Sequence, residues 1–280
     1  MLKKQQFLVI GAVVILTGVL LSLNIKGLVK PSEEAPASTQ PVAAPVISFS
    51  VEQASETARQ DLNANLAQQI KDLEVSLKST PEEDKLAVQQ KLASSWDDVN
   101  KPAPAAFYYE MIAEKESSLK NWLTTGDRFT TAYQNTQDSL IQPALLQKAT
   151  TAYQNALELD KSSLDAQTGL GVAYVNGSAN PMQGIQLLLG VVKEDPKNLK
   201  ANLNLGLFSM KSGQFDKAVE RFKTVIALNP NPEAWFYLAS SYENLGLIDE
   251  AITAYSKSKE LAADPSLGQF VDRKIKELKK

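Results

Sequence analysis

The sequence of 280 residues contains neither cysteine nor histidine. Without cysteine, the chain cannot form disulfides, thiolate nucleophiles, cysteine-ligated zinc sites or lipid attachments at sulfur. Without histidine, it cannot build a Ser-His-Asp triad, a histidine-ligated metal site or a histidine acid/base catalyst. An enzyme made from this chain would have to use carboxylate, lysine, tyrosine or serine–lysine chemistry.

A basic surface is also missing. The chain has 29 Lys+Arg and 32 Asp+Glu, a formal charge of −3. The first 30 residues hold four lysines and no acid, so the remainder carries 25 basic and 32 acidic residues, a formal charge of −7. Because phosphate binding requires a basic patch, this balance excludes nucleic acid as an expected partner.

Motifs of the common enzyme classes are absent too. Gly169-Leu170-Gly171 lacks the third glycine of a dinucleotide-binding loop, and no GxxxxGK[ST] or GxSxG sequence occurs. The acidic clusters at 82–84 and 97–98 are expected at helix ends, where solvated carboxylates are common. The sequence therefore predicts no catalytic, cofactor-binding or metal-binding residues, and a protein that is not an enzyme.

One long hydrophobic run stands near the N-terminus. Phe7 to Ile25 is 19 residues without a charge, which as a helix would extend about 28 Å, close to the thickness of the hydrocarbon layer. The alternative is a cleaved signal peptide, but its apolar region is normally shorter and is followed directly by a small-x-small cleavage site. We therefore expect a tail at 1–6 and a single transmembrane anchor at 7–25.

The charges that flank the predicted anchor do not decide which of its ends faces the cytoplasm. Lys3 and Lys4 on one side balance Lys26 and Lys30 on the other. The short N-terminal tail favours a cytoplasmic N-terminus and an exported body. We therefore expect a single-pass membrane protein whose body is exported. If the source is bacterial, the body lies on the periplasmic side of the inner membrane.

Residues 26–49 form a linker, and a helix is expected after it. The linker is rich in proline (Pro31, Pro36, Pro41 and Pro45), which favours a semi-extended spacer. Ser50 and Gln53 resemble a capping box, with Phe49 as a hydrophobic staple. A helix over 50–79 follows from apolar residues on one face, at positions 62, 66, 70, 73 and 77. That face either packs on the rest of the body or forms a coiled coil with another copy.

A repeat occupies residues 80–263, beginning with an expected helix start at Thr80-Pro81. Its two clearest units lie at 199–263, where the same residue types recur 33 residues apart: Gly213 and Gly246, Ala218 and Ala251, Phe222 and Tyr255. Small residues suit the close approach of helices, aromatic residues fill gaps between units, and glycine permits the turn. The pattern resembles the tetratricopeptide repeat, a helix–turn–helix unit of about 34 residues.

Earlier units resemble the repeat less closely. Residues 167–196 fit, although Gly184 replaces the expected alanine, and another unit around Trp122 and Tyr153 contains about eleven extra residues. A degenerate unit is expected at 86–118. Residues 264–280 have one apolar and one lysine-rich face, as a capping helix needs. The predicted fold is thus an all-α tetratricopeptide solenoid of about 4–5 helix pairs plus this cap, preceded by one transmembrane helix and the proline-rich linker.

The resemblance also implies where partners would bind. In this family, ligands usually contact the first helix of each unit, which lines a concave groove. Transferred residue by residue, those positions give the candidate partner-binding residues Val172, Val175, Leu203, Leu207, Met210, Phe236 and Ser240. An apolar groove would suit a hydrophobic or helical segment. Alternatively, the chain's own helix at 51–77 fills the groove.

Two functions follow from these patterns. The first is a membrane-tethered scaffold or adaptor that binds protein or peptide partners through its repeat surface, without catalysis. The alternative is a self-associating structural component of an envelope or division-type complex, in which the helix at 50–79 forms a homo-oligomer. Both keep the membrane as a partner through the N-terminal anchor.

Overall fold

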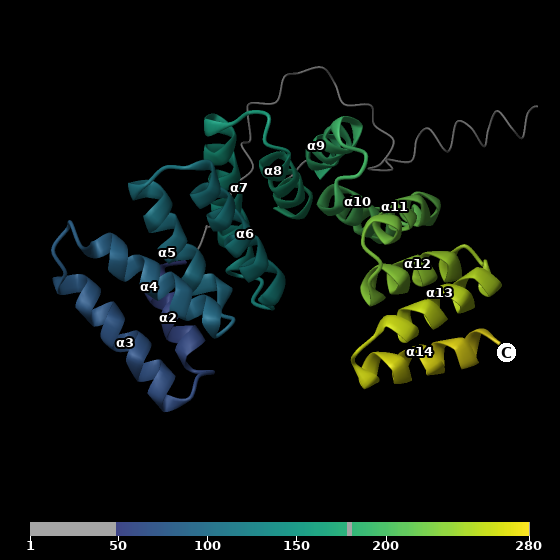
Figure 1. Cartoon of the computed structure of the whole chain (residues 1–280), viewed down its shortest axis with the longest axis horizontal. Helices are drawn as coiled ribbons and strands as arrows, with labels where there is room; N and C mark the ends of the chain where they lie inside the picture. The colour runs from purple at the N-terminus through teal and green to yellow at the C-terminus, as the bar shows by residue number, and fades with distance from the viewer. Residues whose placement is uncertain (1–48, 178–180, 280) are drawn as a thin grey trace, which may run out of the picture. The chain divides into compact units, whose positions relative to one another are not determined.

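The structure, a computed structural model, describes residues 49–177 and 181–279. These residues form thirteen α-helices and contain no strand (Figure 1). The helices are α2 (Val51–Arg59), α3 (Ala64–Ser79), α4 (Lys85–Asp98), α5 (Pro102–Lys115), α6 (Leu119–Asn135), α7 (Gln142–Leu159), α8 (Leu164–Gly177), α9 (Pro181–Glu194), α10 (Leu199–Lys211), α11 (Phe215–Leu228), α12 (Pro232–Asn244), α13 (Ile248–Leu261) and α14 (Pro265–Leu278). The predicted all-α class is confirmed for this part of the chain.

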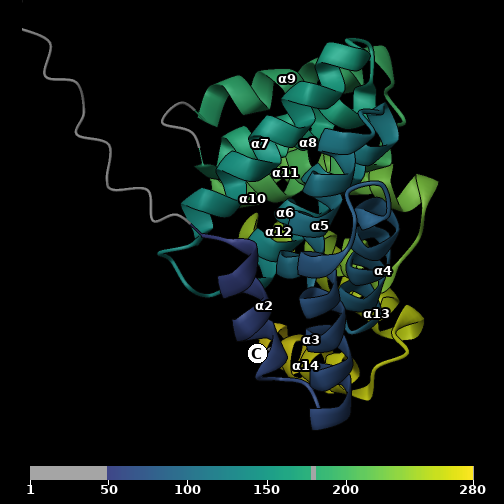
Figure 2. The same ribbon diagram turned by 90° about the vertical axis from the view of Figure 1, so that its left-hand side faces the viewer.

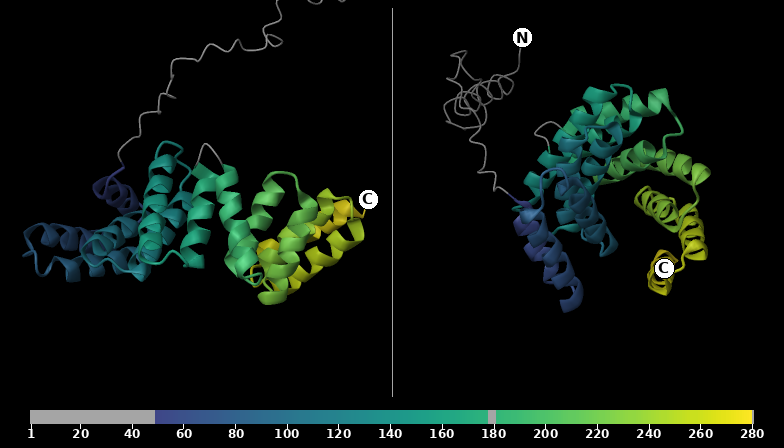
Figure 3. Two further views of the ribbon diagram at one scale, coloured as in Figure 1. Left: turned by 90° about the horizontal axis from the view of Figure 1, so that it is seen from above. Right: turned by 60° about the vertical axis from the view of Figure 1, so that its left-hand side comes forward.

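The helices from α4 to α13 form five consecutive pairs. The two helices of each pair pack on one another, and each pair also packs on the next, as α7 does on α8 and α11 on α12. The first helices of neighbouring pairs touch as well, since α6 contacts α8, α8 contacts α10 and α10 contacts α12 (Figure 3). This nearest-neighbour packing is the arrangement of a helical repeat array, and it agrees with the predicted number of pairs.

The predicted tail at 1–6, the predicted anchor at 7–25 and nearly all of the linker lie outside the described residues. Within 49–177 and 181–279, no helix is both long and apolar enough to cross a membrane.

Three of the turns between paired helices have the same geometry. Asn100, Gly213 and Gly246 have φ angles of 53°, 74° and 74°. In each turn, the N–H of the following residue donates to a carbonyl five residues earlier: Lys101 to Trp96 at 2.9 Å, Gln214 to Ser209 at 2.8 Å and Leu247 to Tyr242 at 3.0 Å. This bond satisfies a carbonyl left free at the helix end. The unit at 86–118, although degenerate in sequence, thus has the same turn as the clearest units, with asparagine in place of glycine.

The extra residues of the unit around Trp122 lengthen its helices. α6 has 17 residues and α7 has 18, whereas the helices of the other four pairs have 13 or 14. The other extra residues of this unit form the connection between α6 and α7 at 136–141. The insertion therefore adds about one turn to each helix and leaves the pairing intact.

The glycine at position 184, where the pattern calls for alanine, has a direct explanation in the packing. A Cβ built on Gly184 would lie 2.4 Å from the carbonyl oxygen of Gly171 and 2.8 Å from the backbone nitrogen of Val175. α8 and α9 therefore meet backbone to backbone, and even a methyl group does not fit. A closer crossing than the one at Ala218 or Ala251 requires the smaller residue.

The helix predicted over 50–79 is two helices, α2 and α3, with a break at residues 60–63. The capping box of Ser50 and Gln53 is present at the start of α2. Asn63 starts the second helix, because its side chain accepts a 3.0 Å hydrogen bond from the N–H of Leu66. α2 packs on α5 and α3 packs on α4 (Figure 2). Ile70, Leu73 and Leu77 of α3 therefore contact the body of the protein, whereas Leu66 and Val75 are exposed.

The next helix begins later than the sequence suggested. Thr80 closes α3, since its hydroxyl donates to the carbonyl of Ser76 at 2.8 Å. Pro81 then opens a turn in which the N–H groups of Asp84 and Lys85 both donate to its carbonyl, at 3.0 and 3.1 Å. Residues 81–84, which were expected to form the first turn of the helix, form this separate turn, and α4 therefore starts at Lys85.

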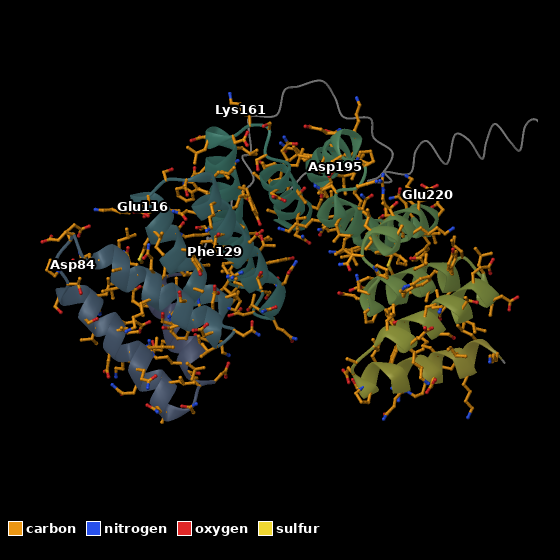
Figure 4. The ribbon with its side chains drawn as sticks, in the orientation of Figure 1. Asp84, Glu116, Phe129, Lys161, Asp195 and Glu220 are labelled. Atoms are coloured by element: carbon orange, nitrogen blue, oxygen red, sulfur yellow. The ribbon has the colours of Figure 1, made fainter. Side chains whose placement is uncertain are left out.

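The core runs along the stack as successive apolar clusters. Phe129 is completely buried between helix pairs, whereas Glu116 and Lys161, at helix ends, are exposed (Figure 4). At the C-terminal end, α14 covers α13 with the buried side chain of Val271. Asp264 caps α14 through a 2.8 Å bond to the N–H of Ser266.

Candidate binding surface

Four of the seven candidate residues lie in one apolar strip. Leu203, Leu207 and Met210 follow one another along one face of α10, at the i, i+4, i+7 spacing of a helix. All three are half-buried and pack against the same apolar cluster as Phe236 of α12. The four side chains cover adjacent first helices, so the predicted stripe is a continuous surface. We call these four residues the apolar strip.

Phe236 belongs more to the core of the C-terminal end than to an open surface. Its ring centroid lies 5.5 Å from that of Tyr255 on α13 and 5.8 Å from that of Phe270 on α14. Aromatic pairs at these separations contribute to packing beyond the area they bury. Ser240, one turn further along α12, is half-buried and lies beside this cluster. A substitution of Phe236 would therefore disturb three helices.

The two candidates on α8 lie apart from the apolar strip. Val172 is only 6% exposed and packs with Leu188 and Val191 of α9. Val175 also faces α9, because its Cγ2 atom lies 2.8 Å from the position of a Cβ on Gly184. The close crossing of α8 and α9 brings both valines against α9, but Val172 also lines a hollow between α6, α8 and α10.

A polar hollow adjoins the apolar strip on the same side of the array. It has a volume of about 290 Å³ and lies between the first helices α6, α8 and α10. Lys200 and Asn204 of α10 form one wall, Asp127 and Thr130 of α6 form the other, and Gly169 of α8 lies between them. We call this the polar hollow.

Lys200 is the exposed cation of the polar hollow. Its ammonium group lies 3.0 Å from Oδ1 of Asp127, and the two side chains are 51% and 41% exposed. A pair this exposed contributes little to stability, because water and salt screen it. A negatively charged or carbonyl-bearing ligand can therefore compete with Asp127 for the lysine at small energetic expense.

Asp127 is held in place by a second donor. The hydroxyl of Tyr153 donates to Asp127 Oδ1 at 2.8 Å, and Thr130 lies 3.2 Å from the same hydroxyl. Since the single phenolic proton goes to Asp127, the hydroxyl of Thr130 donates to Tyr153. Burial, together with the charge of Asp127, raises the pKa of Tyr153 well above its usual value. The tyrosine therefore remains a donor at all physiological pH values.

The N-terminal helices leave this side of the array open. α2 packs on α5, the second helix of its pair, and Phe49 joins the rings of Phe107 and Phe129 at the same end. Neither α2 nor α3 covers α10 or α12. Among the described residues, the helices at 51–79 therefore do not fill the first-helix side of the later repeats.

A second hollow opens on the opposite side. It has a volume of about 460 Å³ and lies between the second helices α11 and α13, with Trp235, Leu238 and Tyr242 of α12 among its lining residues. Lys223 lies on one wall, 5.7 Å from the ring of Tyr242, and Asp249 and Glu250 lie on the other. Positions on first helices were the basis of the prediction, so this site was not anticipated.

The acidic clusters have structural partners. Asp97 accepts three hydrogen bonds from the guanidinium of Arg128, at 2.8 to 3.0 Å, and a fourth from Tyr109 at 2.9 Å. Glu82 pairs with Lys85 at 2.7 Å and with Lys115 at 3.4 Å. In the part of the chain that the structure describes, no group of acidic side chains is placed to hold a metal ion.

Four residues that line the polar hollow are absent from the seven predicted ones: Asp127 and Thr130 on α6, and Lys200 and Asn204 on α10. Asp127 and Thr130 lie five and eight residues after Trp122, in the first helix of the unit predicted around that tryptophan. That spacing is the signal by which they could be found. The inserted residues after α6 obscure the repeat register of this unit, and the seven predicted residues therefore lie only on α8, α10 and α12.

Comparison with known proteins supports the repeat. Residues 203–266 match the tetratricopeptide repeat family. No curated protein matches the sequence. Similar solved structures include MamA from Desulfovibrio magneticus RS-1, which is 18% identical with a TM-score of 0.48 over 64% of this chain and 95% of that one. Another MamA crystal structure is 20% identical with a TM-score of 0.45, over 64% of this chain and 92% of the other. The family match thus assigns residues 203–266 to the tetratricopeptide repeat, the family that their residue pattern resembles.

Proposed function

We propose that this chain is a membrane-tethered scaffold that binds a protein or peptide segment along its first helices, without catalysis. The observation that carries the proposal is the apolar strip beside the polar hollow. Leu203, Leu207 and Met210 remain half-exposed, while Lys200 stands one turn away with only a screened partner. An apolar surface with a few polar anchors is typical of recognition sites.

The arrangement defines the chemistry of the partner. Apolar side chains of a bound segment would cover the strip on α10, and a carboxylate or carbonyl of the same segment would accept from Lys200. Asn204, which lies on the same wall, adds an amide to the polar hollow. We therefore propose a segment with apolar side chains next to an acidic or backbone acceptor group.

The membrane tether is supported by the sequence. The uncharged run from Phe7 to Ile25 and the proline-rich stretch after it would hold the repeats at a fixed distance from the bilayer. Tethering raises the local concentration of whatever the repeats bind. We propose the exported side of the membrane for the body, which is the periplasm if the source is bacterial.

The alternative function, self-association through residues 50–79, is less favoured. Ile70 is 3% exposed, and Leu62, Leu73 and Leu77 pack against the cluster formed with α4 and α5. A coiled coil would need these side chains to be free. Light scattering of the purified chain would detect an oligomer, and we expect α3 to contribute none because its apolar residues at 70, 73 and 77 pack on the body.

Site-specific photo-cross-linking tests the binding surface. A photoreactive residue at Asn204 on α10 is compared with one at Glu220, which is exposed on α11 of the same pair. We expect protein adducts from position 204 and not from position 220, and we expect Leu207→Glu to remove them while helicity is retained. Phe236 is left unchanged because its ring supports three helices. Equal adducts at both positions would contradict the proposal.

A separate experiment tests the membrane and its side. Alkaline phosphatase, which is active only after export, is fused to the C-terminus, and membranes are washed with carbonate. We expect phosphatase activity in the washed membranes. Activity released by the wash would contradict the tether, and a membrane-bound but inactive fusion would contradict the exported side.

A further inference from the structure

The hollow between α11 and α13 has an equivalent place one repeat earlier. Its volume is about 460 Å³, and we call it the outer hollow. The bounds of α12 and α13 are those of α10 and α11 shifted by 33 residues. Each residue of α12 and α13 that lines the outer hollow therefore has a counterpart 33 positions before it. The earlier unit thus shows what the chain itself places at this site.

An arginine side chain occupies the earlier site. Arg221 of α11 donates from Nη1 to Oδ1 of Asn202 on α10 at 3.1 Å. Asn202 is completely buried, so the guanidinium reaches the interior between the two helices. The counterparts of this pair, Ala254 and Trp235, both line the outer hollow. The earlier unit therefore accommodates a guanidinium where the later unit has an opening.

The outer hollow is open because its own unit lacks that arginine. Ala254 ends at its Cβ atom and forms a buried floor together with Leu238, the two being 2% and 4% exposed. The half-buried rings of Trp235 and Tyr242 line the walls. An apolar space with aromatic walls is thus left at the position that Arg221 takes in the preceding unit.

The rim of the outer hollow carries more negative than positive charge. Asp249 and Glu250 in the first turn of α13 are exposed, and among the residues that the structure describes neither carboxylate forms an ion pair. Lys223 on the opposite rim places its ammonium group 5.7 Å from the centre of the Tyr242 ring. A helix start favours a carboxylate, but the counterpart of Glu250 on α11 is Lys217. The second acid is therefore particular to the outer hollow.

We propose that the outer hollow binds an arginine side chain of a partner protein, presented next to an apolar residue. A guanidinium stacks on aromatic rings and forms paired hydrogen bonds with carboxylates. Trp235 and Tyr242 offer the rings, and the two acids on the rim offer the carboxylates. The methylene groups of the arginine and its apolar neighbour would lie on the floor of Leu238 and Ala254. The formal charge of −7 beyond residue 30 also favours a basic partner.

This site is separate from the binding surface on the first helices. The outer hollow opens between the second helices α11 and α13, whereas the polar hollow lies between α6, α8 and α10. The proposal therefore does not depend on the segment proposed for the apolar strip. With both sites filled, the scaffold would hold two different partners at once, one on each side of the repeats.

Two short peptides test the charge of the ligand. The full-length chain in detergent is titrated into acetyl-Gly-Leu-Arg-Gly-amide, or into the same peptide with citrulline, which has the shape of arginine without its charge. Binding is followed by the broadening of the leucine methyl signals in NMR spectra. We expect the arginine peptide to bind about fivefold more tightly or better, because its hydrogen bonds to the carboxylates are charge-assisted. Equal affinities would contradict the proposal.

Charge variants on the rim locate the site. Glu250→Lys copies the charge of the preceding unit and should weaken the arginine peptide about fivefold or more. Asp216→Asn, at the counterpart of Asp249 on α11, is the matched control and should change little. Lys223→Gln should strengthen binding, because it removes a cation that competes for the ring of Tyr242. Weaker binding by Lys223→Gln would mean that the hollow takes an acceptor group and not an arginine.

A final pair of variants separates this site from the first-helix surface. Ala254→Arg combined with Trp235→Asn rebuilds the pair of the preceding unit, so it should close the outer hollow and abolish binding while helicity is retained. Undiminished binding by this folded variant would place the peptide elsewhere. If the double variant does not fold, the exposed substitutions Glu250→Lys and Lys223→Gln still decide. Leu207→Glu should leave peptide binding unchanged, and its loss there would assign the peptide to the apolar strip.

Discussion

The ring of Tyr153 lies directly against the backbone of Gly169, so that a Cβ on this glycine would be 2.2 Å from the tyrosine's Cε1 atom. Gly126 approaches the same ring from α6, where a Cβ would lie 2.6 Å away. The ring cannot swing aside, because it is 1% exposed and its hydroxyl is bonded to Asp127. Tyr153 thus joins α6, α7 and α8 and fixes the wall of the polar hollow.

This contact predicts opposite effects for the same substitution at two glycines. Gly169→Ala should destabilise the chain by about 1–3 kcal/mol, since the added methyl overpacks the core. Gly190→Ala should stabilise the folded monomer by up to about 1 kcal/mol, because alanine is the better helix former and its methyl group meets no atom. Urea unfolding followed by circular dichroism at low protein concentration measures both.

The variant Tyr153→Leu shows whether the destabilisation by Gly169→Ala comes from packing against the tyrosine ring. If the tyrosine ring is the obstacle, Gly169→Ala should be less damaging in the Tyr153→Leu background, giving a coupling above about 0.5 kcal/mol. The same loss in both backgrounds would show that another contact is responsible.

The C-terminal cap is predicted to weaken in acid. Burial alone would raise the pKa of Glu243, but the bonds donated by Lys274 at 2.9 Å and Tyr255 at 2.7 Å outweigh it and hold this pKa below the usual 4.5. A pKa lower in the folded than in the unfolded state stabilises the fold above the unfolded value and is lost as the pH falls through the folded one. Stability should therefore fall below about pH 4.5.

Glu243→Gln tests this pH dependence. At pH 7 the variant should be less stable by about 1 kcal/mol, and the difference from the unmodified chain should shrink as the pH falls below 4.5. Glu260→Gln, which removes the exposed partner of Lys257 on α13, serves as the control and should change little. A Glu243→Gln difference that stays constant down to pH 3 would contradict the role of the carboxylate.

The ion pair of Arg128 and Asp97 is predicted to depend on the shape of the guanidinium. Two nitrogens of Arg128 bond the carboxylate at 2.8 to 3.0 Å, and the guanidinium carbon lies 5.9 Å from the centre of the Tyr109 ring. Lysine keeps the charge but cannot form the paired bonds. Arg128→Lys should therefore cost about 1 kcal/mol, most of what Arg128→Met costs, in thermal unfolding. Full stability of Arg128→Lys would show that charge alone suffices.

The three left-handed turns predict a further contrast. Gly213→Ala and Gly246→Ala should each destabilise by about 1–2 kcal/mol, because alanine is strained at a φ of 74°. Asn100→Gly should be close to neutral or slightly stabilising, since glycine adopts the φ of 53° without strain. Melting temperatures of the three variants, measured together, check the order. A destabilising Asn100→Gly would indicate that the asparagine side chain has a role beyond the turn.

Local, periodic features of the fold could be predicted from the sequence. The 33-residue spacing of Gly213 and Gly246 located the turns, and Ser50 with Gln53 located the start of α2. The apolar spacing did not reveal the break before Asn63, because it begins at Leu62, inside the break, and its other members all lie in α3. Periodicity reports which face is buried, but it is silent on where a side chain interrupts the backbone.

The binding surface was predictable only in part. The residues on α10 and α12 follow from the repeat register, and the structure brings four of them together. The polar hollow depends on the meeting of Asp127 and Lys200, which are 73 residues apart. Their contact is set by the lengths of α6 and α7 and by the ring of Tyr153 between helices, and none of these appears in a local pattern.

The crossing of Gly171 and Gly184 also limits how this protein can evolve. A side chain that obstructs a neighbour can often be accommodated by a second mutation that shortens that neighbour. Here a new Cβ on Gly184 would meet a carbonyl oxygen and a peptide nitrogen, and every amino acid carries those atoms. No compensating substitution on α8 can remove them. If an ancestral protein had alanine at position 184, α8 and α9 reached their present separation only after alanine was replaced by glycine. The reverse substitution, Gly184→Ala, requires the two helices to move apart first.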